Sequence, residues 1–319
     1  MRQKKKTHNL YLGVDGGGTK THVVLIDDEK TILGEGITGA SNPLRVGVEN
    51  AIKNIFAGIE KACDSANRSK GDIVSSQIGL AGVRREDLRY LIRNRFREIL
   101  RIRKVEVTTD AEIALYAATE GREGLVIIAG TGSICMGRNS KGEMASAGGW
   151  GPLAGDEGGG AGIARKALQA IAKSSDGRGE PTIFSDYAVD YFRAGRLEDL
   201  SVAIYAPQVD NARIAGFAKF VSQAATEGDK VAIELLAEAG RELGIAATAV
   251  IQALNMQRRK FPIGKVGSVF KSEDLITKPL LEKVYETAPK AFMSETQKSP
   301  ALAAALMAFQ NYQKNGEKK

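Results

Sequence analysis

Three consecutive glycines, Gly16, Gly17 and Gly18, stand between Asp15 and Thr19 in the stretch LYLGVDGGGTKTHVVLIDDE. Apolar runs on both sides predict a strand before this turn and a strand after it. Glycines let the backbone approach a ligand, and successive N–H groups in such a turn form a concave site for an anion. A simple hairpin needs only two turn residues with one glycine. We therefore expect this turn to bind phosphate.

The glycine loops that open a helix do not fit this turn. A P-loop and a dinucleotide-binding loop both lead into a helix, whereas the residues after Thr19 are β-branched and apolar. The strand–turn–strand pattern recurs about a hundred residues later in GLVIIAGTGSICMGRNSKGEMASAG, residues 124–148. Such a repeat predicts two related domains, each with a phosphate-binding turn that faces a shared cleft.

Asp110 stands where a predicted strand ends and a predicted helix begins, in VEVTTDAEIALYAATEG. Open α/β sheets bind ligands at the carboxyl ends of their strands, so this carboxylate is a candidate catalytic group. An aspartate at a helix start is also a common N-cap. From the residues alone, both interpretations stay open.

A glycine-rich loop with two acids, Asp156 and Glu157, follows the second turn in GGWGPLAGDEGGGAG and leads into a long predicted helix. Its glycines would bring backbone close to a ligand, and its carboxylates could accept hydrogen bonds from hydroxyls. The presence of Trp150 and the helix directly after the loop argue against a simple linker. From Ser174 onward we expect helices with loops, a last strand and turn within residues 264–275, and a closing helix near residues 301–312. That helix is a candidate to pack back on the first domain.

The length of 319 residues predicts two domains, and the net charge is +7. The ends of the chain carry six of these net positive charges, so the charge says little about a partner. These end residues are Arg2, Lys4, Lys5, Lys6, Lys314, Glu317, Lys318 and Lys319. One internal basic segment, residues 87–104, has Leu88, Leu91, Ile92, Phe96, Ile99 and Leu100 at helical spacing. We interpret its arginines as the solvated face of a packed helix rather than as a nucleic-acid or membrane site.

Targeting signals and redox motifs are absent from the sequence. It has no run of 18 apolar residues and no apolar core of a signal peptide, so we expect a cytoplasmic protein with no membrane partner. Cys63 and Cys135 are far apart and in no C-x-x-C motif, which supports neither a disulfide framework nor a cysteine-ligated cluster. With only His8 and His22, a histidine zinc site and a Ser-His-Asp triad are disfavoured.

Seven segments in this order resemble a known group of proteins: GVDGGGTKT, GASNP, TTDAEIA, AGTGSI, GGWGPLAGDEG, ARIAGFAKFV and VGSVFKS. They are similar to the acetate and sugar kinase, Hsp70 and actin superfamily, and more closely to the N-acetylglucosamine kinase branch of the BadF/BadG/BcrA/BcrD ATPase family. The resemblance implies an α/β fold of two ribonuclease-H-like, actin-like ATPase domains with an ATP and sugar cleft between them. It places the domains at residues 1–119 and 120–319.

The resemblance also implies roles for individual residues. Asp15 would position Mg²⁺, and Asp110 would be the catalytic base. The residues implied in ATP binding are Gly16, Gly17, Gly18, Thr19, Lys20, Thr131, Gly132, Gly216, Gly267, Ser268 and Ser272. Those implied in sugar binding are Asn42, Asp110, Ser133, Gly149, Trp150, Gly151 and Asp156. Ile134 stands where the animal N-acetylglucosamine kinases have asparagine, which leaves the exact sugar open.

The expected function is therefore an ATP-dependent, Mg²⁺-requiring kinase of a small sugar, with N-acetylglucosamine as the first candidate. A glucosamine kinase and a broad-specificity hexokinase are alternatives. An ATPase activator of a dehydratase or reductase would require cysteines that hold an iron–sulfur cluster. A sugar-responsive repressor would require a DNA-binding module before Leu10, where we expect no room for one. We also expect that the protein forms a homodimer and does not bind nucleic acid.

Overall fold

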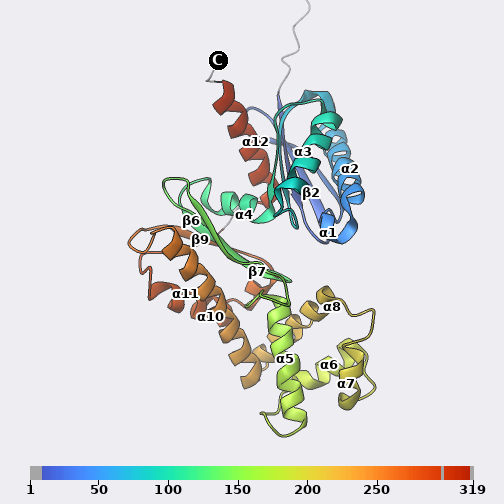
Figure 1. The fold of residues 1–319 in the computed structure, drawn as a ribbon, viewed down its shortest axis with the longest axis vertical. Helices are drawn as coiled ribbons and strands as arrows, with labels where there is room; N and C mark the ends of the chain where they lie inside the picture. The colour runs from blue at the N-terminus through green and yellow to red at the C-terminus, as the bar shows by residue number, and fades with distance from the viewer. Residues whose placement is uncertain (1–8, 296–297, 317–319) are drawn as a thin grey trace, which may run out of the picture. The chain divides into compact units, whose positions relative to one another are not determined.

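The computed structural model describes residues 9–295 and 298–316 and divides the chain into two compact units (Figure 1). The second unit runs from Arg122 to Glu295, and the first comprises the described residues before and after it. The basic residues expected in the N-terminal tail, and Glu317, Lys318 and Lys319, lie outside the described residues. None of the helices in the described part of the chain combines the length and apolar character that a membrane span needs.

The first unit contains a five-stranded mixed sheet in the order β3-β2-β1-β4-β5. The strands β1 and β2 are antiparallel, as are β2 and β3, whereas β4 and β5 run parallel to β1. The strands are β1 (Leu10–Gly16), β2 (Lys20–Ile26), β3 (Ile32–Gly39), β4 (Ile73–Leu80) and β5 (Val105–Thr109). The helices are α1 (Pro43–Val46), α2 (Val48–Ala66), α3 (Glu86–Leu100), α4 (Asp110–Thr119) and α12 (Pro300–Gly316), with a 3-10 turn at Lys70–Asp72.

Helices cover both faces of this sheet, which explains why β1 has apolar residues or glycine from Leu10 to Val14, before Asp15. Leu12 packs in the cluster with α2 and α3, whereas its neighbour Tyr11 points to the opposite face and packs with α12. At Gly13 the close approach of α12 leaves no room for a side chain, because a Cβ atom would lie 2.2 Å from Ala301 O. The C-terminal helix α12, red in Figure 1, is therefore part of the first unit.

The second unit repeats the same sheet order, β8-β7-β6-β9-β10. Its antiparallel strands are β6 (Gly124–Ala129), β7 (Ser133–Arg138) and β8 (Met144–Gly148), and its parallel additions are β9 (Pro262–Val266) and β10 (Phe292–Ser294). The helices are α5 (Gly160–Ser175), α6 (Phe184–Phe192), α7 (Leu200–Ala203), α8 (Asn211–Gly216), α9 (Ala218–Thr226), α10 (Lys230–Ala253) and α11 (Asp274–Tyr285). Short 3-10 turns span Leu197–Asp199 and Ser268–Ser272. The shared order confirms the predicted α/β class with two related domains.

Two details of the sequence prediction are wrong. The last strand is β10 and not the strand before residue 275; with three residues, β10 is too short for an alternating pattern to be detected. Leu91, expected on the buried face of α3, is 47% exposed, whereas Ile92, Phe96 and Leu100 are buried as predicted. The apolar stripe of α3 is therefore narrower than the sequence indicates.

Candidate active site

The triple-glycine turn joins β1 to β2 and is closed by a hydrogen bond from Gly17 N to Lys20 O of 2.9 Å. The first glycine is required by packing, because a Cβ atom at Gly16 would lie 2.2 Å from Ser41 Oγ. A Cβ atom at Gly17, in contrast, would meet nothing closer than Lys20 O at 3.6 Å. Packing within the chain therefore does not explain the second glycine. A glycine at this position is instead consistent with a ligand that approaches the backbone closely.

The third glycine lies beside an arginine side chain. A Cβ atom at Gly18 would lie 2.8 Å from Nη1 of Arg45, whose Nη1 donates a hydrogen bond of 3.3 Å to Gly18 O. Thr19 and Lys20 complete the turn and are exposed. Arg45 is a residue that sequence reasoning missed, and its only signal was its place three residues after Asn42 in GASNPLR.

Asp15 and Asp110 lie at the same end of the first sheet, where the parallel strands β1, β4 and β5 have their carboxyl ends. In the strand register Asp15 pairs with Gly79 of β4, which pairs with Thr108 of β5. Burial, and after it the negative charge of Asp110, raise the pKa of Asp15 to about 6. Burial also raises the pKa of Asp110. Buried carboxyls whose ionised forms are disfavoured are typical of a site that takes up a cation or a proton.

The N-cap of α4 is Thr109, so the capping interpretation of Asp110 is wrong. The hydroxyl oxygen of Thr109 accepts a hydrogen bond from Glu112 N, and a Glu112 carboxylate oxygen accepts one from Thr109 N at 2.7 Å. This reciprocal pair is a capping box. Asp110 is the first residue of the helix, and its Oδ1 accepts a hydrogen bond of 3.0 Å from Ala111 N. Capping therefore does not explain why an acid stands there.

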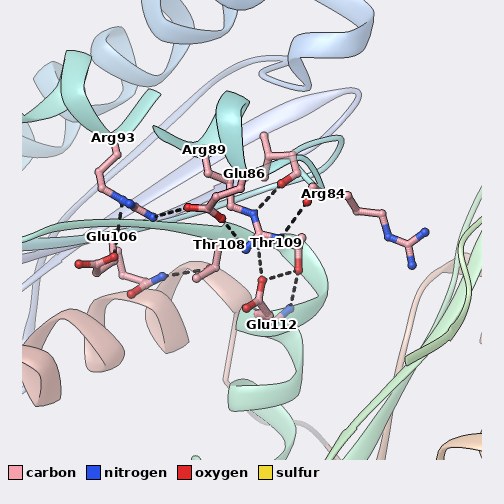
Figure 2. Close-up of polar contacts among 10 residues, drawn as sticks. Arg84, Glu86, Arg89, Arg93, Glu106, Thr108, Thr109 and Glu112 are labelled. Carbon is pink, nitrogen blue, oxygen red and sulfur yellow. Dashed lines mark hydrogen bonds and ion pairs between the residues drawn. The ribbon is translucent and has the colours of Figure 1, made fainter. Parts of the chain in front are cut away.

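Figure 2 shows the polar contacts that hold this edge of the sheet in place. Arg89 Nε donates a hydrogen bond of 2.7 Å to Val83 O, which fixes the turn after β4. Arg93 lies between Glu86 and Glu106 and links α3 to β5. These arginines of the basic segment are therefore engaged in ion pairs and turn contacts within the first unit.

Asn42 caps the short helix α1, since its Oδ1 accepts a hydrogen bond of 3.0 Å from Leu44 N. The same side chain packs on Gly82, where a Cβ atom would lie 2.3 Å from Oδ1 and where φ is +82°. Both contacts explain the residue type by local structure. A contact between Asn42 and a sugar stays a prediction.

The turn between β6 and β7 in the second unit is also packed without side chains. A Cβ atom at Gly132 would lie 2.4 Å from Oδ2 of Asp156. Asp156 is buried, and its Oδ1 accepts a hydrogen bond from Ser133 N, while Ser133 Oγ donates one of 2.6 Å to Glu157 O. Ser133 and Asp156 thus join the turn to the loop before α5. Their implied contact with a sugar stays a prediction.

The loop after β8 carries a large exposed aromatic side chain on a glycine backbone. Gly149 and Gly151 have φ values of +71° and +85°, which disfavour other residues. Gly149 N donates to Ser133 O at 2.8 Å, and Trp150 between the two glycines is 75% exposed. Ile134 packs on Gly149, since a Cβ atom at Gly149 would lie 3.1 Å from Cδ1 of Ile134.

A cavity of about 810 Å³ lies in the second unit, a size that suits a nucleoside. Four residues expected near ATP line it: Thr131, Gly216, Ser268 and Ser272. Gly267, which precedes Ser268, has a φ of +118° and packs against Ala129 O. Gly132 lies at the turn described above and not in this cavity wall.

One face of α9 supplies further wall residues that sequence reasoning missed, namely Lys219, Ser222, Gln223 and Thr226. Their spacing of three and four residues in AKFVSQAAT is a sequence signal for one helix face. Ser222 Oγ lies 2.8 Å from Ser272 Oγ, which joins this face to the 3-10 turn after β9.

The donor chemistry of the first unit suits a hard divalent cation. Carboxylate oxygens are the ligands that Mg²⁺ prefers, together with water and phosphate oxygens. Asp15 and Asp110 are two such groups; burial, and after it the charge of Asp110, raise the pKa of Asp15, and a nearby cation would favour its ionised form. Within residues 9–295 and 298–316, no cluster of three or more His, Cys, Asp or Glu forms a closed metal cage. Asp15 and Asp110 are therefore the residues of this site that could hold such a cation.

Similarity to known proteins covers nearly the whole chain. This chain is 34% identical over 298 residues to an N-acetylmuramic acid/N-acetylglucosamine kinase of Clostridium acetobutylicum; the match covers 93% of this chain and 97% of that protein. It is 29% identical over 310 residues to an N-acetyl-D-glucosamine kinase of Dictyostelium discoideum, covering 94% and 97%. A crystal structure of a Chromobacterium violaceum protein shares the fold, with a TM-score of 0.78 and 24% identity over 95% of this chain and 99% of that one. Residues 12–308 match the pattern of one family, and this chain belongs to it: the BadF/BadG/BcrA/BcrD ATPase family.

Proposed function

We propose that this chain is an ATP-dependent sugar kinase that transfers the terminal phosphoryl group to a hydroxyl of an amino sugar, with N-acetylglucosamine as the first candidate. Its relatives with 34% and 29% identity over almost their full length are named as kinases of N-acetylated amino sugars. The family to which the chain belongs is described as an ATPase family. Both observations support ATP as the phosphoryl donor.

The observation that carries the proposal is the position of Asp110. This carboxyl lies next to Asp15 at the carboxyl end of the sheet, and capping does not account for it. Phosphoryl transfer needs little covalent chemistry from the protein beyond positioning and a group that accepts the proton of the attacking hydroxyl. We infer that Asp110 takes this proton as the sugar oxygen bonds to phosphorus. The bond from phosphorus to the bridging oxygen breaks at the same time, and ADP leaves with the electron pair.

The other predicted residues have supporting roles in this proposal. The Gly16–Gly17–Gly18 turn binds phosphate oxygens through its backbone. Asp15 would hold Mg²⁺, which would supply positive charge to neutralise the phosphates. The cavity of the second unit takes the adenosine, with Ser268 and Ser272 in its wall. We also propose that the protein acts in the cytoplasm and forms a homodimer.

A coupled assay of ADP release tests this function. Purified protein with ATP and Mg²⁺ is given N-acetylglucosamine, N-acetylmuramic acid, glucosamine or glucose in turn. We expect an N-acetylated amino sugar to raise ADP release well above the rate without sugar. Strongest stimulation by glucosamine or glucose would replace the substrate by one of the alternatives, and background rates with every sugar would refute the kinase.

An ATPase activator would release ADP at a rate that no sugar changes. It would also need thiolates that can reach an iron–sulfur cluster. Cys63 and Cys135 are both buried, and burial raises the pKa of Cys63 to about 11. The positions of the two cysteines therefore favour the kinase.

A further inference from the structure

Two segments of the cavity wall in the second unit start at the glycine turn between β6 and β7, which the sequence predicts to bind phosphate. A Cβ atom at Gly160 would lie 3.0 Å from Gly130 O in this turn and 3.1 Å from Ala215 O, so α9 starts close to the turn. A Cβ atom at Gly267 would lie 3.0 Å from Gly130 N, so the 3-10 turn Ser268–Ser272 starts there as well.

The two segments contact each other again four residues further on. Ser222 of α9 and Ser272 both line the cavity, and their Oγ atoms lie 2.8 Å apart. At the rise of an α-helix, Ser222 lies about 6 Å along α9 from its first residue, Ala218. In a nucleotide whose phosphates lie at the turn, the ribose comes next and the base lies beyond it. The serine pair therefore lies in the part of the cavity that suits the base.

The direction of the hydrogen bonds at the serine pair follows from the number of protons. Each hydroxyl carries one proton. Ser222 Oγ donates a hydrogen bond of 3.2 Å to Ala218 O, because a carbonyl oxygen can only accept. The proton in the 2.8 Å bond therefore comes from Ser272. Toward the cavity, the Ser272 oxygen is left with acceptor capacity alone.

The next polar group on the same face of α9 also donates its proton within the helix. The hydroxyl of Thr226 donates a hydrogen bond of 2.7 Å to Gln223 O. The Gln223 side chain donates from Nε2 to Glu227 Oε1 at 3.0 Å. The two lysines of the cavity wall, Lys219 and Lys271, are exposed. The hydroxyl groups at this end of the cavity therefore offer acceptors to a ligand.

We propose that Ser222 is a positioning residue that makes the cavity select adenine. The proposal rests on the proposed function, because it takes the cavity to bind a nucleotide. By accepting the proton of Ser272, Ser222 leaves that hydroxyl as an acceptor for the exocyclic amino group of adenine. Hypoxanthine has a carbonyl oxygen in place of this amino group. Two acceptors would then face each other without a proton between them, which is costly in a site closed from water.

Calorimetry with ADP and with inosine diphosphate (IDP) tests this assignment in the intact protein. We expect the wild type to bind ADP about tenfold or more tightly than IDP, because only ADP supplies the proton for the Ser272 oxygen. In Ser222→Ala the Ser272 hydroxyl can turn its proton to the ligand, so IDP should gain affinity and the ratio should fall about fivefold or more. Ser222→Thr keeps a hydroxyl that can bond the helix carbonyl, and it should keep the preference for ADP.

The matched control is Ser175→Ala on α5. It removes a hydroxyl that donates to Ala172 O at 2.9 Å outside the cavity wall, so the ratio of the two affinities should stay the same. Ser272→Ala should lose the preference for ADP. Adding Ser222→Ala to it should change the ratio no further, because Ser222 acts through Ser272.

Equal losses of ADP and IDP affinity in Ser222→Ala, with a lower melting temperature, would show that the serine pair only supports the wall and would overturn the proposal. A constant ratio of ADP to IDP, with a changed ratio of ADP to 2′-deoxy-ADP, would place the ribose at the pair and overturn it as well. The affinity comparison needs no sugar. Turnover that no sugar stimulates, with the preference for ADP intact, would therefore refute the sugar kinase and leave the adenine selection standing.

Discussion

Replacing Asp110 by Asn removes the proposed base and keeps the shape of the side chain. Asn can still accept the hydrogen bond from Ala111 N, and the helix start depends on Thr109 rather than on residue 110. General-base catalysis is commonly worth about 10²- to 10⁴-fold in rate. We therefore expect kcat for sugar phosphorylation to fall by that factor while ATP affinity stays near the wild-type value.

The same substitution should not destabilise the fold. The pKa of Asp15 is raised from 3.8 to about 6, which corresponds to about 2–3 kcal/mol of disfavoured ionisation near neutral pH. Burial is the largest cause and the charge of Asp110 the next. Asp110→Asn removes that charge, so the melting temperature at pH 7.5 should be unchanged or a few degrees higher, since 1 kcal/mol corresponds to about 2–4 °C.

The assay combines initial rates of ADP release, calorimetry with ATP and a melting curve on the same preparation. Asp64→Asn, an exposed acid-to-amide change on α2, is the matched control and should leave all three unchanged. Near-normal turnover of Asp110→Asn would remove this residue from the mechanism. A large fall in melting temperature would instead show that the carboxylate is structural.

Three further outcomes are expected. Gly17→Val should weaken ATP binding about tenfold or more with a near-native melting curve, because a Cβ atom there meets nothing within 3.5 Å, whereas Gly16→Val should lower the melting temperature through its clash with Ser41; equal ATP affinity in Gly17→Val would mean that the turn is only a connection. In metal-free protein, the folded state holds the proton of Asp15 more tightly than the unfolded chain, so the free energy of unfolding should decrease as pH rises from about 4 to about 6. This decrease should be smaller in Asp15→Asn, where only the raised pKa of Asp110 still contributes to it. Chelation by EDTA should abolish sugar-stimulated ADP release and added Mg²⁺ should restore it; full activity in EDTA would contradict the metal role of Asp15.

Local patterns in the sequence were sufficient for the α/β class and for the repeated strand–turn–strand unit. The apolar runs around both glycine turns became the antiparallel strands of two sheets with the same order. The strand and helix that flank Asp110 also agree with the prediction. These features depend on side-chain alternation and turn residues within about ten positions, which is the range over which a sequence pattern is informative.

The reasons for most of these individual residues were decided by contacts between distant segments. Asp110 is the exception, because the capping box that separates it from an N-cap joins Thr109 and Glu112, three residues apart, and the pattern T-x-x-E was a sequence signal for it. The three glycines of the first turn look alike in the sequence, yet Gly16 faces Ser41 and Gly18 faces Arg45, whereas Gly17 faces no such neighbour. The place of α12 was decided in the same way, because Gly13 and Ala301 are almost three hundred positions apart in the chain and come together only when the helix packs on β1. Such contacts depend on which surfaces the folded chain brings together, and no local periodicity encodes that pairing.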